Sequence, residues 1–340
     1  MGISEDRVTP FLSNWKCFLI AAAMSLANCQ YGYDAAAVGG FQAMIGFLKV
    51  FGYEDPKAKI GWSIATQPQQ LIASCLNIGT ILGLVFTTLW SRYLGRRPAI
   101  WAGSAILAVA IAIQLGTTSL AALCIGRVIL GIGNGFYFTF CNIYTVETAP
   151  PHLRAVLGSL FGIWTNFGAL MGAIANNFSK NYTDKRAYQI PLASLYALPV
   201  ILTVLMFLIP ESPRWLLVRG RSAEAEAALA SLRGNSLKHE LLREEFVEME
   251  RGIEEEKHIA GTTDFLDIFK GANLRRTIIV VGVVLSHSSC GIWLFVAYGV
   301  SISGEPFERN LADRPARRTS FKWAASTTRS RSKSSSSSWA

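Results

Sequence analysis

The chain contains seven apolar segments that are each long enough to cross a lipid bilayer. An α-helix rises about 1.5 Å per residue, so about twenty apolar residues cross the hydrocarbon layer of roughly 30 Å. The seven expected spans cover residues 16–40, 71–90, 99–117, 120–144, 155–178, 192–209 and 277–303. The fold class predicted from this pattern is an all-α membrane protein.

The composition agrees with a chain that is mostly embedded in lipid. Hydrophobic residues make up 51% of the sequence and charged residues only 16%, and the mean hydropathy is +0.32. These values exclude an ordinary soluble enzyme. The first span is too long for a secretory signal and lacks the small-residue cleavage pattern of one, so we expect it to remain in the mature protein.

Basic residues in the short flanking loops predict the orientation of the spans. Three arginines follow the second span within residues 92–97, and three follow the sixth span within residues 214–221. Short loops rich in Lys and Arg face the cytosol. The expected parts are a cytosolic N-terminus (1–15), a six-helix transmembrane bundle (16–209), a cytosolic helical linker (210–276), a seventh transmembrane helix (277–303) and a disordered, basic, Ser-rich tail (304–340).

The linker carries signals for two short helices. Ser222 can cap the first helix, Glu224 and Glu226 favour its first turn, and Gly234 can end it. A second, acidic helix is expected over residues 237–258. The simpler interpretation of the linker is a spacer that covers the cytosolic mouth of the bundle.

The net charge of +9 looks at first like a signal for nucleic-acid binding. The tail from Gly304 onward holds +5 of it, however, and in residues 210–276 eleven basic residues are offset by thirteen acidic ones. A linker of mixed charge is a solvated surface and does not form a phosphate-binding groove. We expect the lipid bilayer as a partner and no nucleic acid.

Two patterns that could indicate cofactor sites lack the required spacing. None of the six cysteines has a CxxC partner, so neither a zinc site nor a disulfide framework is expected. The glycines within residues 131–135 resemble a dinucleotide loop, but Phe136 stands where the third glycine belongs and no strand precedes. These glycines, like Gly79 and Gly83, should instead allow close helix packing. We expect no cofactor, no metal and no catalytic residue.

Two charged residues fall inside the expected spans at similar depths. Asp34 lies six residues from the outer end of the first span, and Arg127 lies seven residues from the outer end of the fourth. A charge at the bilayer centre costs about 2.5–3.5 kcal/mol on insertion scales, so a pairing of the two is expected. The pair is either a static contact that fixes helix register or a proton-coupling site, in which Asp34 takes up a proton and releases Arg127.

Several motifs resemble those of the sugar porter branch of the major facilitator superfamily, and of its fungal members most. The matching residues are Tyr31-Gly32-Tyr33-Asp34, Gly95-Arg96-Arg97, Gly126-Arg127, Tyr144 with Glu147, Ala149-Pro150 and Arg154, residues 210–215, and a pattern from Gly220 to Gly234. The resemblance extends from about residue 31 to residue 298. It implies the major facilitator fold and a secondary transporter of sugars or sugar-like solutes in a membrane, expected to be the plasma membrane.

The resemblance also implies roles for the charged residues. It supports proton coupling by Asp34 with Arg127 as its partner, and it makes the linker a latch between two bundles. A set of charged residues at the cytosolic side should form ion pairs that hold an inner gate shut: Arg96, Arg97, Glu147, Arg154, Glu211 and Arg214. The alternative for this set is a snorkelling role that fixes the orientation of the helices.

The chain departs from the family where the solute should bind. The fifth-helix glutamine that contacts sugar falls at Gly162, the paired glutamines of the seventh helix fall at His287 and Ser288, and the asparagine after them at Trp293. Other departures are Arg92, Asn142 and Ala155 in place of the family's acid, proline and glycine. Because a hexose needs many paired donors and acceptors, we expect compensation from these residues: Trp164, Asn166, His287, Ser288 and Trp293.

The sequence therefore leaves two classes of solute, a sugar or another compound. Sugar is the leading class, and a larger glycoside, a polyol or a lipophilic metabolite is the alternative. His287 in an apolar span indicates either a substrate or proton role or a hydrogen-bonded packing residue.

The last part of the chain does not follow the family pattern. Family members continue with five more spans that complete a second bundle, whereas hydropathy falls sharply after Ser303 and residues 309–340 are basic and Ser-rich. Our hypothesis is that residues 304–340 are a frame-shifted or mis-spliced readout of a longer gene. The alternatives are a truncated regulatory protein and a sugar sensor that does not transport.

Overall fold

The structure, a computed structural model, describes most of the chain. It covers residues 15–56, 61–91, 93–150, 153–233, 239–260 and 269–291, and within these ranges it leaves out the side chains of residues 239, 258–260, 272, 287 and 288. The tail and the second half of the expected seventh span, including Trp293, lie outside the described residues.

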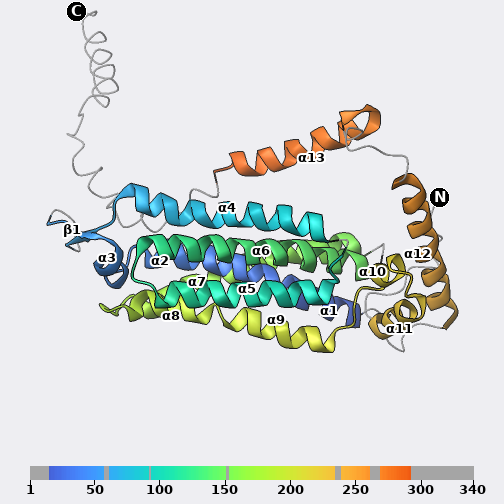
Figure 1. The fold of residues 1–340 in the computed structure, drawn as a ribbon, viewed down its shortest axis with the longest axis horizontal. Coiled ribbons are helices and arrows are strands. Elements are labelled where there is room, and N and C mark those ends of the chain that lie inside the picture. Colours follow the sequence, from blue (N-terminus) through green and yellow to red (C-terminus); the bar gives the residue numbers. More distant parts are fainter. Residues whose placement is uncertain are drawn as a thin grey trace, which may run out of the picture.

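The described chain is almost entirely helical (Figure 1). Its helices are α1 (Trp15–Ser25), α2 (Ala27–Phe41), α3 (Ile45–Phe51), α4 (Thr66–Trp90), α5 (Arg96–Gly116), α6 (Leu120–Thr148), α7 (Arg154–Ser179), α8 (Arg186–Ser194), α9 (Ala197–Leu208), α10 (Pro213–Val218), α11 (Ser222–Arg233), α12 (His239–Ala260) and α13 (Gly271–Ser289). Two short strands, β1 (Tyr53–Glu54) and β2 (Trp62–Ser63), pair antiparallel between α3 and α4.

The first six expected spans are present as helices at nearly the expected positions. Helices α4, α5, α6 and α7, and the stretch Arg186–Leu208 formed by α8 and α9, are long and apolar enough to cross a membrane. The stretch Trp15–Phe41 and helix α3 meet at an angle of 79°, and the two together make a sixth span if this bent pair is counted as one. The class predicted from the sequence, an all-α membrane protein, is confirmed.

The seventh span stays a prediction. Helix α13 covers its first part and is drawn apart from the bundle (Figure 1). Helix α13 has 19 residues and is not one of the described helices that are apolar enough to span a membrane, and the expected segment continues to residue 303, beyond the described part.

The linker folds into three helices at one end of the bundle (Figure 1), which we call the linker end. Two of them, α11 and α12, fall close to the expected ranges 222–234 and 237–258. The third, α10, begins at Pro213, a residue suited to the first helical position because its missing N–H would have no intrahelical partner there.

Glycines bring the helices of the bundle into backbone contact. A Cβ on Gly79 of α4 would lie 2.1 Å from the Val128 carbonyl oxygen of α6, and a Cβ on Gly131 would lie 2.2 Å from the Leu76 oxygen. The same holds between α7 and α2, where a Cβ on Gly168 would lie 2.1 Å from the Cys29 oxygen. The expectation that Gly79 and Gly131 serve helix packing is confirmed, and Gly168 adds a contact of the same kind.

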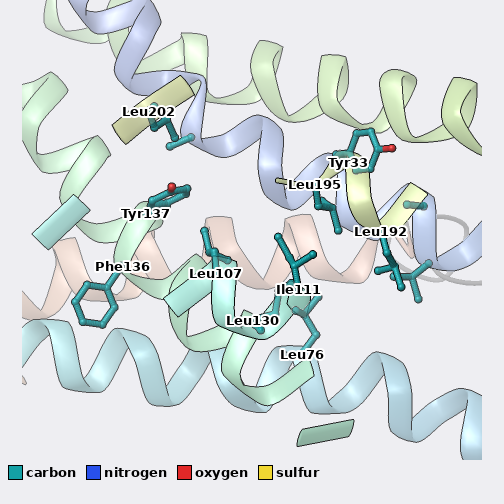
Figure 2. Packing of buried hydrophobic residues seen from close by; sticks show 14 of the residues in the cluster. Tyr33, Leu76, Leu107, Ile111, Leu130, Phe136, Tyr137, Leu192, Leu195 and Leu202 are labelled. Carbon is teal, nitrogen blue, oxygen red and sulfur yellow. The ribbon is translucent and has the colours of Figure 1, made fainter. Parts of the chain in front are cut away.

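Large apolar side chains fill the space between the helices. Figure 2 shows Leu76 of α4, Leu107 and Ile111 of α5, and Leu130 of α6 directed toward one another. The outer faces carry exposed apolar residues, as expected of surfaces that contact lipid; Leu208, for example, is 77% exposed.

Replacing Gly168 by alanine should destabilise the bundle, because its Cβ would clash with the α2 backbone. We expect a loss of about 1–3 kcal/mol, typical of overpacking, measured as a lower melting temperature of the purified chain in detergent. Gly158 on the same helix is the matched control, since a Cβ there meets nothing within 4 Å. Gly158→Ala should leave the melting temperature unchanged or slightly raised. Equal losses in both variants would contradict the packing argument.

Candidate functional site

A buried ion pair joins α2 and α6 inside the bundle. The Nη1 atom of Arg127 donates to both carboxylate oxygens of Asp34, at 2.8 Å and 2.9 Å. The two side chains are 1% and 0% exposed, and the Phe41 ring centroid lies 5.8 Å from the guanidinium carbon of Arg127. The pairing expected from the similar depths of the two residues is present. Its role in proton coupling stays a prediction.

A second cluster of charges lies at the linker end. Arg96, the first residue of α5, makes two parallel bonds to Glu147 of α6, from Nε at 3.0 Å and from Nη2 at 2.6 Å. Its Nη1 donates to the Ser91 carbonyl oxygen at 3.1 Å. Both side chains of the pair are only 11% exposed. Two-point contact of this kind fixes the orientation of a guanidinium and is stronger than a single bond, so it fastens α5 to α6.

Glu211, which follows the end of the sixth span, caps the N-terminus of α5. Its Oε1 accepts the backbone N–H of Arg96 at 3.0 Å, and its Oε2 accepts that of Arg97 at 3.3 Å. The first N–H groups of a helix have no intrahelical partner, and the helix dipole favours an anion there. Gly95 leaves room for this carboxylate, since a Cβ on it would lie 2.7 Å from Oε2 of Glu211.

Ser212 and Tyr144 complete the linker-end network, and the sequence had not assigned them a role in it. The Ser212 hydroxyl donates to Oε2 of Glu147 at 2.6 Å and also accepts the Trp215 N–H at 3.4 Å, which caps α10. The Tyr144 hydroxyl donates to the Pro210 carbonyl oxygen at 2.9 Å. A serine directly before a helix-starting proline is an N-cap signal, so the position of Ser212 was available from the sequence.

Three of the predicted gate residues do not join this network through their side chains in the described contacts. Arg97 donates to the Met206 carbonyl oxygen at 2.9 Å and lies over the Trp101 ring at 5.4 Å. Arg214 pairs with Glu256 of α12. Arg154 begins α7 with an exposed side chain, and the described ion pairs do not join it to Glu147. The expected cluster thus forms around Arg96, Glu147 and Glu211.

A buried arginine fastens the linker to the end of α6. Arg233, the last residue of α11, is 3% exposed, makes two bonds to Glu245 of α12, at 3.0 Å and 2.5 Å, and donates to the Thr148 carbonyl oxygen at 3.0 Å. Burial by itself lowers the pKa of Arg233, but the Glu245 carboxylate and, to a smaller extent, Cys17 together raise that pKa above its usual value. The arginine is therefore charged at every physiological pH.

The structure places only part of the predicted substrate set. Trp164 packs edge-on against Phe167 of the same helix, with ring centroids 5.6 Å apart. Asn166 is exposed on α7 and its side-chain nitrogen donates to the Gly162 carbonyl oxygen at 2.8 Å. His287 and Ser288 lie in α13 with undescribed side chains, and Trp293 lies outside the described residues. These five residues are not brought together among the described contacts.

An open groove of about 490 Å³ lies between α6 and α7. It is lined by Asn142, Thr145, Val146, Gly158, Ser159, Phe161 and Gly162. Its volume falls in the range of small-molecule sites, about 300–1,000 Å³. Two of its lining residues, Asn142 and Gly162, are positions where the chain departs from the sugar porter pattern. The predicted substrate set did not include any residue of this lining.

The bundle, its buried ion pair and the capped linker end define a multi-pass membrane protein of the major facilitator type. A family model described as sugar (and other) transporter matches residues 20–305. The chain belongs to this family. The sugar porter resemblance of its motifs is confirmed.

Fungal transporters are among its relatives. The chain is 27% identical over 289 residues to the major facilitator-type transporter ecdD of Aspergillus rugulosus, covering 84% of this chain and 52% of that protein. It is 32% identical over 241 residues to a quinate permease of Neurospora terricola, covering 68% and 44%. It is 29% identical over 288 residues to a low-affinity glucose transporter of Kluyveromyces lactis, covering 84% and 50%. The chain spans about half the length of these relatives.

Solved structures of the same architecture are similar to the fold. A partially occluded, inward-open conformation of the xylose transporter XylE from E. coli matches with a TM-score of 0.64 and 23% identity, covering 85% of this chain and 67% of that one. A structure described as the proton:xylose symporter XylE bound to 6-bromo-6-deoxy-D-glucose matches with a TM-score of 0.63 and 25% identity, covering 81% and 58%. These relatives are transporters and not enzymes, as the sequence predicted for this chain.

Removing the Glu147 charge should destabilise the linker end, because the nearly buried Arg96 and the Ser212 hydroxyl lose their shared partner. For Glu147→Gln we expect a loss of about 3 kcal/mol, the order found when one member of a buried pair is removed. The measurement is thermal unfolding of the purified chain. Glu224→Gln is the control, since Glu224 pairs with Arg221 in an exposed contact and such pairs contribute little. A similar loss in the two variants would show that Glu147 does not hold the end together.

Proposed function

We propose that the chain is the first bundle, linker and following helix of a secondary transporter that moves sugars or sugar-like solutes across a membrane by alternating access, coupled to protons. The observation that carries this proposal is the Asp34–Arg127 pair, buried between two helices of a membrane bundle. Ionisable residues inside a membrane mark ion and proton pathways. Permeases take up solutes from outside the cell, so we place the protein in the plasma membrane.

The pair is suited to convert proton binding into movement of helices. Two bonds join Arg127 to the charged carboxylate of Asp34. When a proton binds one of the carboxylate oxygens, Asp34 becomes neutral and its charge attraction to Arg127 is lost. The contact between α2 and α6 then weakens. Protonation and solute binding can each favour the same conformation, which is the requirement for coupling.

The linker-end network is suited to hold the inner gate closed. Arg96, Glu147 and Glu211 tie the start of α5, the end of α6 and the start of the linker into one unit. Opening at this end requires that these bonds break together. We propose this as their role, as the family resemblance implies. The relatives include a glucose transporter and a proton:xylose symporter, which supports coupled sugar transport.

A solute less polar than a hexose is the second candidate, and the groove favours it. The side-chain donors on its walls bond to carbonyl oxygens of their own helices: Asn142 to Phe138, Thr145 to Cys141, and Ser159 to Val156. Such local bonds leave the donors occupied. The glycines Gly158 and Gly162 add space without polar atoms. One relative is a quinate permease, which shows that the family's solutes extend beyond sugars.

Asp34→Asn should abolish the pH dependence of uptake, because asparagine cannot bind or release a proton. We expect the parent chain to accumulate radiolabelled D-xylose or D-glucose faster at pH 5 than at pH 7 in yeast cells without hexose uptake of their own. Arg127→Ala should reach the membrane and lose accumulation. The same pH dependence in the parent and in Asp34→Asn would remove Asp34 from the coupling role, and no uptake by the parent would favour a sensor or a regulatory protein.

Gly162→Gln should shift solute preference toward hexoses, because it restores a side-chain amide at the groove where the family has one. The measurement is the thermal stabilisation of the purified chain by D-glucose and by quinate. We expect the variant to gain at least threefold in affinity for D-glucose relative to the parent. Gly158→Gln, one turn away in the same groove, controls for filling of space alone. An unchanged preference in Gly162→Gln would exclude the groove as the sugar site.

A further inference from the structure

Two buried amide side chains beside the ion pair have no hydrogen-bond partner in the protein. Gln30 of α2 is 0% exposed and Asn134 of α6 is 1% exposed. Both nitrogens and both oxygens of these amides lack a protein partner, and so do Nε and Nη2 of Arg127. Buried polar atoms almost always have a partner, and leaving one without costs about 1–3 kcal/mol. The two amides and the arginine of the ion pair carry six such atoms, and these need an explanation.

Helix periodicity places the two amides on the same interface as the ion pair. Gln30 is four residues from Asp34, and Asn134 is seven residues from Arg127, so each amide shares a helix face with its charged neighbour. The helices run in opposite directions. The Cys17 thiol donates to the Thr148 carbonyl oxygen, so α1 and α2 lead away from the linker end, and α6 leads toward it.

Aromatic rings bound this polar stretch at both ends. Toward the linker end, Tyr31 of α2 contacts Phe138 of α6 with ring centroids 5.1 Å apart. Asp34 is three residues beyond Tyr31 and Asn134 four residues before Phe138, so both lie one turn farther from the linker end. At the other end the Phe41 ring lies over Arg127. The ion pair and Asn134 thus lie between these ring contacts, and Gln30, the residue before Tyr31, lies at their linker-end boundary. We call this region between α2 and α6 the enclosed stretch.

Two aromatic rings, those of Phe138 and Phe161, separate the enclosed stretch from the groove. Phe138 contacts Phe161 of α7 at 5.6 Å, and Phe161 lines the groove. The groups that interact electrostatically with Asp34 are Arg127 from α6 and Tyr31 and Tyr33 from its own helix. Asn176 of α7 and Ser194 of α8, which bond to α2, are neutral. A proton that enters from the groove would therefore meet amides and tyrosines before it meets Asp34.

We propose that this stretch, lined by Gln30, Asn134 and Arg127, is a water-binding site that delivers the proton to Asp34. Buried water typically makes about three hydrogen bonds to otherwise unpartnered polar groups, and an amide both donates and accepts. In the transfer, a hydronium ion from the groove gives its proton to the water chain, and the last water gives one to a carboxylate oxygen of Asp34. The delivery role rests on the proposed function, whereas the water site can be tested alone.

Hydroxyl-radical footprinting of the full chain in phosphatidylcholine nanodiscs tests the site, because radicals generated from bound water oxidise the rings beside it. Phe41 and Phe140 are both 0% exposed. We expect Phe41 to be oxidised at least fivefold more than Phe140, which lies six residues from Asn134 on another face of α6. Equal oxidation of the two rings in the parent chain would overturn the proposal, and this comparison needs no variant.

Variants connect the water to the amides. Asn134→Leu and Gln30→Leu should each lower Phe41 oxidation at least threefold. Asn28→Leu is the matched control, since Asn28 is a buried amide on α2 with an unpartnered oxygen, about 200° around the helix from Gln30. It should leave Phe41 oxidation unchanged. If Asn28→Leu lowers it as much as the other two variants, the assignment to Gln30 and Asn134 is wrong.

The delivery role is measured with D-xylose. Gln30→Leu and Asn134→Leu should slow proton-driven uptake at least fivefold and leave exchange of internal for external D-xylose unchanged, since exchange needs no net proton transfer. Unchanged uptake in both variants would refute the delivery role. If the parent takes up no D-xylose in either assay, the proposed function and the delivery role fail together, while the footprinting still decides the water site.

Discussion

The hydrocarbon layer offers no hydrogen-bond partner, and this constraint governs how every polar group of the bundle is arranged. Hydroxyl and amide side chains of the spans bond to carbonyl oxygens one turn back on their own helix, as Thr80 does to Leu76 and Thr145 to Cys141. Charges pair with charges, as Asp34 does with Arg127. Where helices approach closely, glycines such as Gly131 and Gly168 allow backbone contact without side chains. Among the described residues, six of the buried polar atoms without a partner belong to Gln30, Asn134 and Arg127, and others, such as Oδ1 of Asn28, lie elsewhere in the bundle.

The sequence predicted the spans because hydropathy and helix length decide them. Each of the first six expected segments matches a described helix or helix pair, and the depths of Asp34 and Arg127 were enough to predict that they meet. The family motifs predicted three of the charged residues that form the linker-end network, Arg96, Glu147 and Glu211. These predictions rest on local signals: the hydropathy along a helix and short motifs of neighbouring residues.

The contacts of individual side chains were harder to predict from the sequence, because they depend on distances between residues far apart in the chain. Glu211 bonds to backbone N–H groups 114 and 115 residues away, which no motif reveals. Arg97 has the charge of a gate residue, but its position beside Trp101 directs it to a carbonyl oxygen. The groove is lined by residues of both α6 and α7, including Gly158 and Gly162, and its lining residues are not contiguous in the sequence. Arg233 belongs to the family pattern from Gly220 to Gly234, but its burial against α6 could not be predicted from the sequence.

The linker places charges of opposite sign on helix ends of opposite polarity. Glu211 lies at the N-terminus of α5, where the dipole is positive, and the Arg233 guanidinium lies at the C-terminus of α6, where the dipole is negative. The linker is therefore held by the fields of the membrane helices as well as by packing. Because Arg233 is buried, salt screens this attachment little, whereas salt weakens the exposed ion pairs of the linker, such as that of Arg221 with Glu224. Salt concentration thus distinguishes the buried anchor of the linker from the ion pairs on its surface.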